Sequence, residues 1–137
     1  MPGTPSILIV EDEYGLAELL RDMLTELGYE VSLAINGRLA LEVLREREID
    51  LVLTDAMMPV MDGPELARAM RADERHRGIP IVMMTSLAAA LPSTPGLYEA
   101  VLGKPFTPTA LLKVLDAHVA RESSRMGSDT TREQSES

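Results

Sequence analysis

Residues 49–59 read IDLVLTDAMMP, an apolar run that stops at an acidic residue. The continuous apolar stretch at 51–53 is typical of a strand that is covered on both faces of a parallel sheet. Asp55 ends the run, and Pro59 and the Asp-Gly pair at 62–63 turn the chain away. Open α/β sheets bind ligands at the carboxyl ends of their strands, so Asp55 occupies a place where functional residues occur. Taken alone, it could equally be a residue that ends a strand and begins a turn.

The rest of the chain alternates short apolar runs with helical patterns. Further strands are predicted at 7–10, 30–35, 81–84 and 100–102. Apolar residues at helical spacing predict helices over 16–27, 38–46, 62–70 and 107–119. Strands that alternate with helices form parallel βαβ units, so the predicted fold class is α/β, with a doubly wound sheet that has helices on both faces.

One segment interrupts this alternation. Between residues 87 and 98 the chain contains Pro92 and Pro95, and a proline inside a helix costs about 3 kcal/mol. We therefore expect a short or irregular fourth helix, with at most one turn over 87–91 and then an irregular loop.

Length and composition limit the possible functions. The 137 residues suit one folded domain, placed at residues 1–122, and the almost wholly polar remainder predicts a disordered tail over 123–137. A formal net charge of -9 argues against intrinsic nucleic-acid binding, because phosphate contacts need basic side chains. The sequence has no cysteine, no membrane-length apolar run and no signal-type N-terminus, so we expect a cytoplasmic protein without membrane contact. His76 and His118 are interpreted as surface residues.

Polar side chains follow four of the predicted strands. Glu11 and Asp12 follow the first strand, Asp55 the third, Thr85 the fourth and Lys104 the fifth. Three neighbouring carboxylates repel one another, and Mg2+, which prefers oxygen ligands, would relieve that repulsion. A lysine suits a phosphate oxygen, and a carboxylate can form an aspartyl phosphate. The set of residues therefore indicates phosphoryl transfer, with Asp55 as the nucleophile.

Four motifs resemble those of the receiver domain of two-component response regulators, of the stand-alone, chemotaxis-regulator type. The resemblance covers about residues 5–121. The motifs are LIVEDE at 8–13, DAMMPVMDG at 55–63, MTS at 84–86 and KPF at 104–106. The resemblance implies a flavodoxin-like sheet with strand order 2-1-3-4-5.

The resemblance also implies a role for each site residue. Asp55 would be the phosphoacceptor. The Mg2+ ligands would be Asp12 directly, Glu11 through water, Asp55, and Met57 through its backbone carbonyl only. The Thr85 hydroxyl would follow the phosphoryl group when the domain switches.

Lys104 would contact a phosphoryl oxygen, and the Lys104-Pro105 bond is a candidate for the cis form. The family usually carries an aromatic residue three positions before this lysine, where this chain has Val101. We therefore expect the usual threonine–aromatic switch to be altered here.

We expect the phosphoryl donor to be a sensor histidine kinase or a histidine phosphotransfer protein, and the output to be contact with a downstream protein. Such a domain catalyses only its own phosphorylation and dephosphorylation, so it is a signalling receiver rather than an enzyme. A monomer or weak homodimer is expected.

Two alternatives remain. A pseudo-receiver would bind its partner without phosphorylation, which Val101 and the interrupted fourth helix would favour. A phosphohydrolase of the haloacid dehalogenase type also uses an aspartyl nucleophile, but that class has a second aspartate two residues later, where this chain has Met57.

Overall fold

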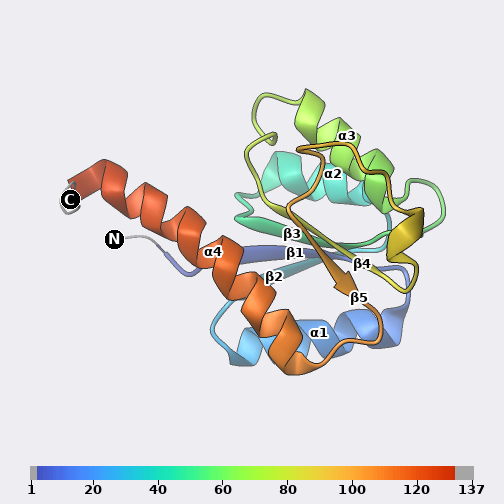
Figure 1. The fold of residues 1–137 in the computed structure, drawn as a ribbon. Coiled ribbons are helices and arrows are strands. Elements are labelled where there is room, and N and C mark those ends of the chain that lie inside the picture. Colours follow the sequence, from blue (N-terminus) through green and yellow to red (C-terminus); the bar gives the residue numbers. More distant parts are fainter. Residues whose placement is uncertain (1–2, 132–137) are drawn as a thin grey trace.

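The computed structural model describes residues 3–131 and contains one parallel sheet with helices on both faces (Figure 1). The strands are β1 (Ser6–Val10), β2 (Glu30–Ala34), β3 (Leu51–Asp55), β4 (Ile81–Thr85) and β5 (Ala100–Gly103). The helices are α1 (Tyr14–Glu26), α2 (Gly37–Glu46), α3 (Gly63–Ala72), the short 3-10 helix η1 (Ala88–Ala90) and α4 (Pro108–Thr131). The strand order is β2-β1-β3-β4-β5, which confirms the predicted doubly wound α/β fold.

Every residue of β1, β3 and β4 is buried, as continuous apolar runs require in a sheet covered on both sides. Alternate side chains enter two separate cores. Leu8 and Val10 pack with α2 and α3 on one face, whereas Ile7 and Ile9 pack with α1 and α4 on the other. Figure 1 shows these two helical layers above and below the sheet.

The capping residues of two helices define where the chain turns after a strand. Asn36 accepts a hydrogen bond from the Leu39 backbone N–H at 2.9 Å and begins α2. Asp62 and Glu65 form a reciprocal capping box at the start of α3, with both bonds at 2.9 Å. The Asp-Gly pair after β3 therefore starts a helix, and this helix begins close to Asp55.

The connection between β4 and β5 contains only the 3-10 helix η1. This confirms the prediction that the segment over 87–98 forms a short or irregular helix in place of a full one. The chain then continues without regular structure to β5, and Leu97 is the buried residue of this stretch. The prolines explain the difference from a full helix, since each removes a backbone donor and clashes with the preceding turn.

The C-terminal segment differs from the expectation in part. The backbone of α4 is helical to Thr131, within the predicted disordered tail at 123–137, and residues 132–137 lie outside the described residues. An established helix can extend through polar residues because elongation avoids the cost of nucleation. Val119 is the last residue of α4 described as buried, and the domain boundary at 122 stays a prediction.

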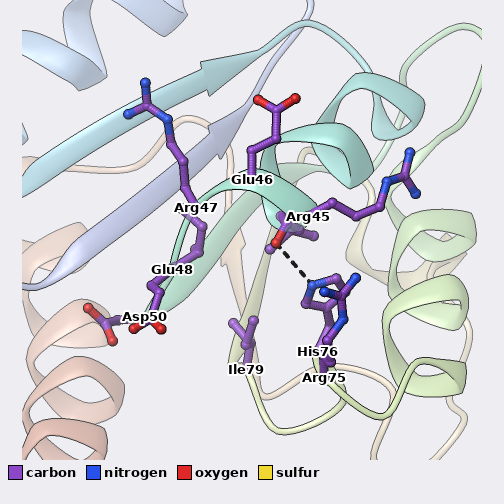
Figure 2. Close-up of a pocket in the computed structure, with 10 residues that line it drawn as sticks. Arg45, Glu46, Arg47, Glu48, Asp50, Arg75, His76 and Ile79 are labelled. Carbon is purple, nitrogen blue, oxygen red and sulfur yellow. Dashed lines mark hydrogen bonds between the residues drawn. The ribbon is translucent and has the colours of Figure 1, made fainter.

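The surface interpretation of His76 was wrong. Its side chain is only 5% exposed, and its Nε2 lies 3.1 Å from the Leu44 carbonyl oxygen (Figure 2). The residue lines a cavity of about 370 Å³ between the end of α2 and the α3–β4 connection. His118 is half-buried on α4. A single histidine in a polar segment gives no local sign of burial, so only the packing of the α3–β4 connection against the end of α2 reveals it.

Candidate functional site

The residues predicted for phosphoryl transfer and metal binding lie at the carboxyl edge of the sheet, whereas the predicted switch residue Val101 lies within β5. Glu11 and Asp12 follow β1, and Asp55 is the last residue of β3. The ladder pairs Asp55 with Met84 and Thr85 with Gly103, and Lys104 comes directly after β5. Parallel strands bring their carboxyl ends to one edge, so the expected convergence is found.

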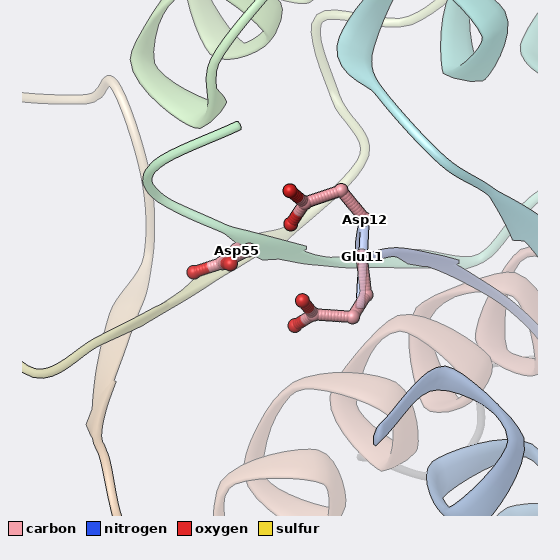
Figure 3. Close-up of side chains that lie close together, drawn as sticks. All are labelled: Glu11, Asp12 and Asp55. Atoms are coloured by element: carbon pink, nitrogen blue, oxygen red, sulfur yellow. The ribbon is translucent and has the colours of Figure 1, made fainter. Parts of the chain in front are cut away.

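The three acids form one cluster, shown in Figure 3. Glu11, Asp12 and Asp55 each place a ligand oxygen within 4.8 Å of the others. Glu11 and Asp55 are buried, at 2% and 9% exposure, whereas Asp12 is exposed to solvent. Buried carboxylates this close need a compensating positive charge.

The pKa of Glu11 is raised to about 7, mainly by burial and also by the negative charge of Asp55. A hydrogen bond from the Glu13 backbone N–H to Oε2, at 3.1 Å, and the charge of Lys104 act in the opposite direction. Because the net shift is upward, the Glu13 N–H and Lys104 do not fully offset the cost of a negative charge on Glu11. An all-oxygen set of close carboxylates, one with its charge suppressed, fits a hard divalent cation such as Mg2+.

Lys104 supplies the positive charge that the protein does provide. Its Nζ lies 3.4 Å from Glu11 Oε1 and 3.3 Å from Asp55 Oδ1. Partial burial lowers the pKa of Lys104, but the charges of Glu11 and Asp55 outweigh this, so its pKa lies above the ordinary value. The ammonium is therefore charged beside Asp55. The Lys104-Pro105 bond is cis, as the motif indicated.

Thr85 and Met57 flank the cluster. The Thr85 side chain is buried, and its Oγ1 accepts a hydrogen bond from the Leu87 backbone N–H at 3.0 Å. Its hydroxyl hydrogen remains available to donate to an incoming oxygen. Met57 lies two residues after Asp55, and its side chain is 68% exposed. Val101, on β5, is 36% exposed.

Gly63 has a function that sequence analysis missed. A Cβ at this position would lie 2.6 Å from the Asp55 carbonyl oxygen and 2.9 Å from Met83 Sδ. Its backbone N–H also donates to the Ala56 carbonyl oxygen at 3.0 Å. In the sequence, Gly63 indicated only a turn, whereas in the fold it allows the start of α3 to approach the end of β3.

Comparison with known proteins identifies the family. The model of the response regulator receiver domain matches residues 7–116. The chain belongs to this family. Receiver domains are signalling domains that accept phosphate from histidine kinases and bind Mg2+ through acidic residues.

Solved receiver structures share the fold. The Vibrio cholerae chemotaxis response regulator CheY4 is 30% identical, with a TM-score of 0.73, over 83% of this chain and 98% of that one. The receiver domain of the sensor histidine kinase PA1611 from Pseudomonas aeruginosa PAO1 is also 30% identical, with a TM-score of 0.78, over 86% of this chain and 99% of that one. That structure has a magnesium ion coordinated in its active site cleft.

Curated relatives are longer. The probable transcriptional regulator ycf27 of Cyanidium caldarium is 39% identical over 108 residues, which are 77% of this chain and 42% of the relative. The DNA-binding response regulator MtrA of Mycobacterium tuberculosis H37Rv is 36% identical over 118 residues, which are 84% of this chain and 50% of the relative. The receiver chain thus spans about half the length of these relatives or less. Within residues 3–131, none of the helices has the length and apolar character needed to cross a membrane.

Proposed function

We propose that this receiver takes a phosphoryl group from a phosphohistidine donor onto Asp55 and signals through changed protein contacts. The donor would be a sensor histidine kinase or a histidine phosphotransfer protein, in the cytoplasm. The observation that carries the proposal is the position of the buried Asp55 carboxylate within one cluster with Glu11 and Asp12, 3.3 Å from the Lys104 ammonium.

Asp55 would act as the nucleophile. One of its carboxylate oxygens attacks phosphorus, a P–O bond forms, and the P–N bond to the donor imidazole breaks. The electron pair of that bond stays on the imidazole nitrogen, which then takes up a proton. Lys104 would hold a phosphoryl oxygen, and the Thr85 hydroxyl would donate to another.

Glu11, Asp12, Asp55 and the Met57 carbonyl would hold Mg2+. When bound, the ion supplies charge neutralisation for the acids and the phosphoryl oxygens. Glu11 then acts as an anion, because a nearby cation favours its charged form.

The test is intact-protein mass spectrometry after incubation with acetyl phosphate and Mg2+. Asp55→Asn and a metal-free sample should take up no phosphoryl group, whereas Asp22→Asn, an exposed acid on α1, should react as the wild type does. Equal labelling of Asp55→Asn and wild type would refute the assignment of the phosphoacceptor.

A pseudo-receiver is the second candidate, and the exposed Val101 beside an irregular crossover supports it. In that case phosphorylation would leave the partner surface unchanged. Backbone amide NMR of the phosphorylated or beryllofluoride-bound chain distinguishes the two. Shifts at Leu87 and Val101 favour a switch, and shifts confined to residues next to Asp55 favour the pseudo-receiver.

A further inference from the structure

Arg71, near the end of α3, joins three segments of the chain at the amino edge of the sheet. Its Nη1 donates to the carbonyl oxygens of Arg77 and Ile79, at 2.8 and 2.9 Å. Its Nε donates to those of Gly96 and Leu97, at 3.0 and 3.1 Å. The side chain is only 18% exposed. One guanidinium therefore ties α3 to the connections on both sides of β4.

The same guanidinium also reaches the start of β5 through Glu99. Arg71 Nη2 lies 2.8 Å from Glu99 Oε1, which also accepts the Ile81 backbone N–H at 2.7 Å. The Glu99 backbone N–H in turn donates to the Ile81 carbonyl oxygen at 2.8 Å. Glu99 is thus held on β4 by its backbone and its side chain, directly before β5 begins.

Besides this anchor, β5 is restrained by its pairing with β4 and by Leu102, which is buried in the core beside α1 and α4. Within residues 3–131, β5 is a short edge strand that pairs only with β4, and its Val101 is partly exposed. The crossover before it contains no full helix to cover this part of the sheet. Burial of Leu102 opposes a slip of one residue, which would turn that side chain outward, so a further anchor matters against slips that keep the same face inward.

The register of β5 sets the position of Lys104. The pairing of Thr85 with Gly103 and a 2.8 Å hydrogen bond from the Lys104 backbone N–H to the Thr85 carbonyl oxygen place the lysine beside Asp55. A slip of two residues would keep the same faces of β5 inward, yet it would move Lys104 by about 7 Å. The Nζ contact with Asp55, now 3.3 Å, would then be lost.

We propose that Arg71 is a positioning residue for the phosphoryl-transfer site: through Glu99 it holds β5 in the register that places Lys104 beside Asp55. The expected effect on phosphorylation rests on the proposed function, whereas the effect on the register of β5 does not. Arg71 lies at the opposite edge of the sheet from the acids, so it touches neither the cluster nor a bound phosphoryl group.

Hydrogen exchange of backbone amides in the full chain tests the proposal, with Arg71→Met as the variant. Arg68→Met, an exposed arginine of the same helix, is the matched control. In Arg71→Met the Lys104 amide should lose protection by about tenfold or more relative to the Ala56 amide, which bonds to Met84 within the sheet. In Arg68→Met both amides should stay as in the wild type. Parallel changes of the two amides in Arg71→Met would overturn the proposal.

Kinetics supply the second readout. Displacement of Lys104 should slow phosphorylation by acetyl phosphate by up to about a hundredfold, because small misplacements of a catalytic group have effects of this size. The affinity for Mg2+, measured by calorimetry, should change by less than about threefold, which is under 1 kcal/mol. Glu11 and Asp12 follow β1 and Asp55 ends β3, and Arg71 forms none of its hydrogen bonds with either strand. Equal losses of Mg2+ affinity and rate would instead indicate general destabilisation and overturn the proposal.

If Arg71→Met does not fold, a pair of variants at Glu99 decides. Glu99→Gln keeps the acceptor oxygen and should protect Lys104 as in the wild type, whereas Glu99→Ala should not. Identical protection in the two would overturn the proposal. If the wild type accepts no phosphoryl group, the proposed function fails, and the exchange comparison still decides whether Arg71 sets the register.

Discussion

Gly63→Ala tests whether the close approach of α3 to β3 positions Asp55. The new Cβ would meet the Asp55 carbonyl oxygen at 2.6 Å, whereas ordinary contact begins at 3.4 Å, so one of them must move by about 0.8 Å. The other neighbours are Met83 Sδ at 2.9 Å and the Ala56 Cα at 3.0 Å. Two of the three atoms belong to the backbone beside a fully buried central strand, so they cannot yield as a flexible side chain does.

The expected loss follows from two opposing effects. Overpacking of this size costs about 1–3 kcal/mol, and the better helix propensity of alanine returns up to about 1 kcal/mol. We expect the free energy of unfolding to fall by about 1–2 kcal/mol. Movement of the Asp55 backbone should also weaken Mg2+ binding and slow phosphorylation.

Urea unfolding measures this change, with Gly15→Ala as the matched control. Gly15 lies in α1, and a Cβ added there would have no neighbour within 4 Å, so alanine should stabilise the protein by up to about 1 kcal/mol. A Gly63→Ala protein as stable as Gly15→Ala, with unchanged Mg2+ binding, would refute the reasoning.

Three further predictions concern the loop after β3 and the acidic cluster. Val60 has φ 75° and is 72% exposed, so Val60→Asn should raise the free energy of unfolding by about 1 kcal/mol, whereas Ile35→Asn, also solvent-facing but with negative φ, should not; urea unfolding of both variants gives the comparison. In metal-free protein the raised pKa of Glu11 means that the native state binds its proton more tightly than the unfolded state does. The free energy of unfolding should therefore decline as the pH rises from 4.5, the ordinary pKa of a glutamate, to about 7, the pKa of Glu11 in the fold. A Glu11→Gln protein that shows the same decline in urea unfolding would contradict this. Mg2+ at about 100 times its Kd should add about 2.7 kcal/mol to the free energy of unfolding, and thermal unfolding with and without EDTA should show most of that gain missing in Asp55→Asn.

Much of the fold could be predicted because its signals are local. Some residues determine the structure of their own short segment. Examples are the buried run at 51–53, the prolines of the β4–β5 connection and the capping pair Asp62 and Glu65. The convergence of Asp55 with Glu11, Asp12 and Lys104 also follows from local signals, since parallel strands bring their carboxyl ends to one edge. The order of the strands followed from the family resemblance.

Other features depend on contacts between distant segments. The buried His76 lies against a carbonyl oxygen of α2, and most hydrogen bonds of Arg71 are with backbone oxygens that no side-chain pattern marks. The partly suppressed charge of Glu11 depends on burial by the whole fold. The sequence by itself, through its apolar periodicity and its turn residues, thus determined the strands, the helices and the edge of the sheet at which the acids lie. Tertiary structure alone decided the distances, burial and charge states within that site, because these arise from atoms that are far apart along the chain.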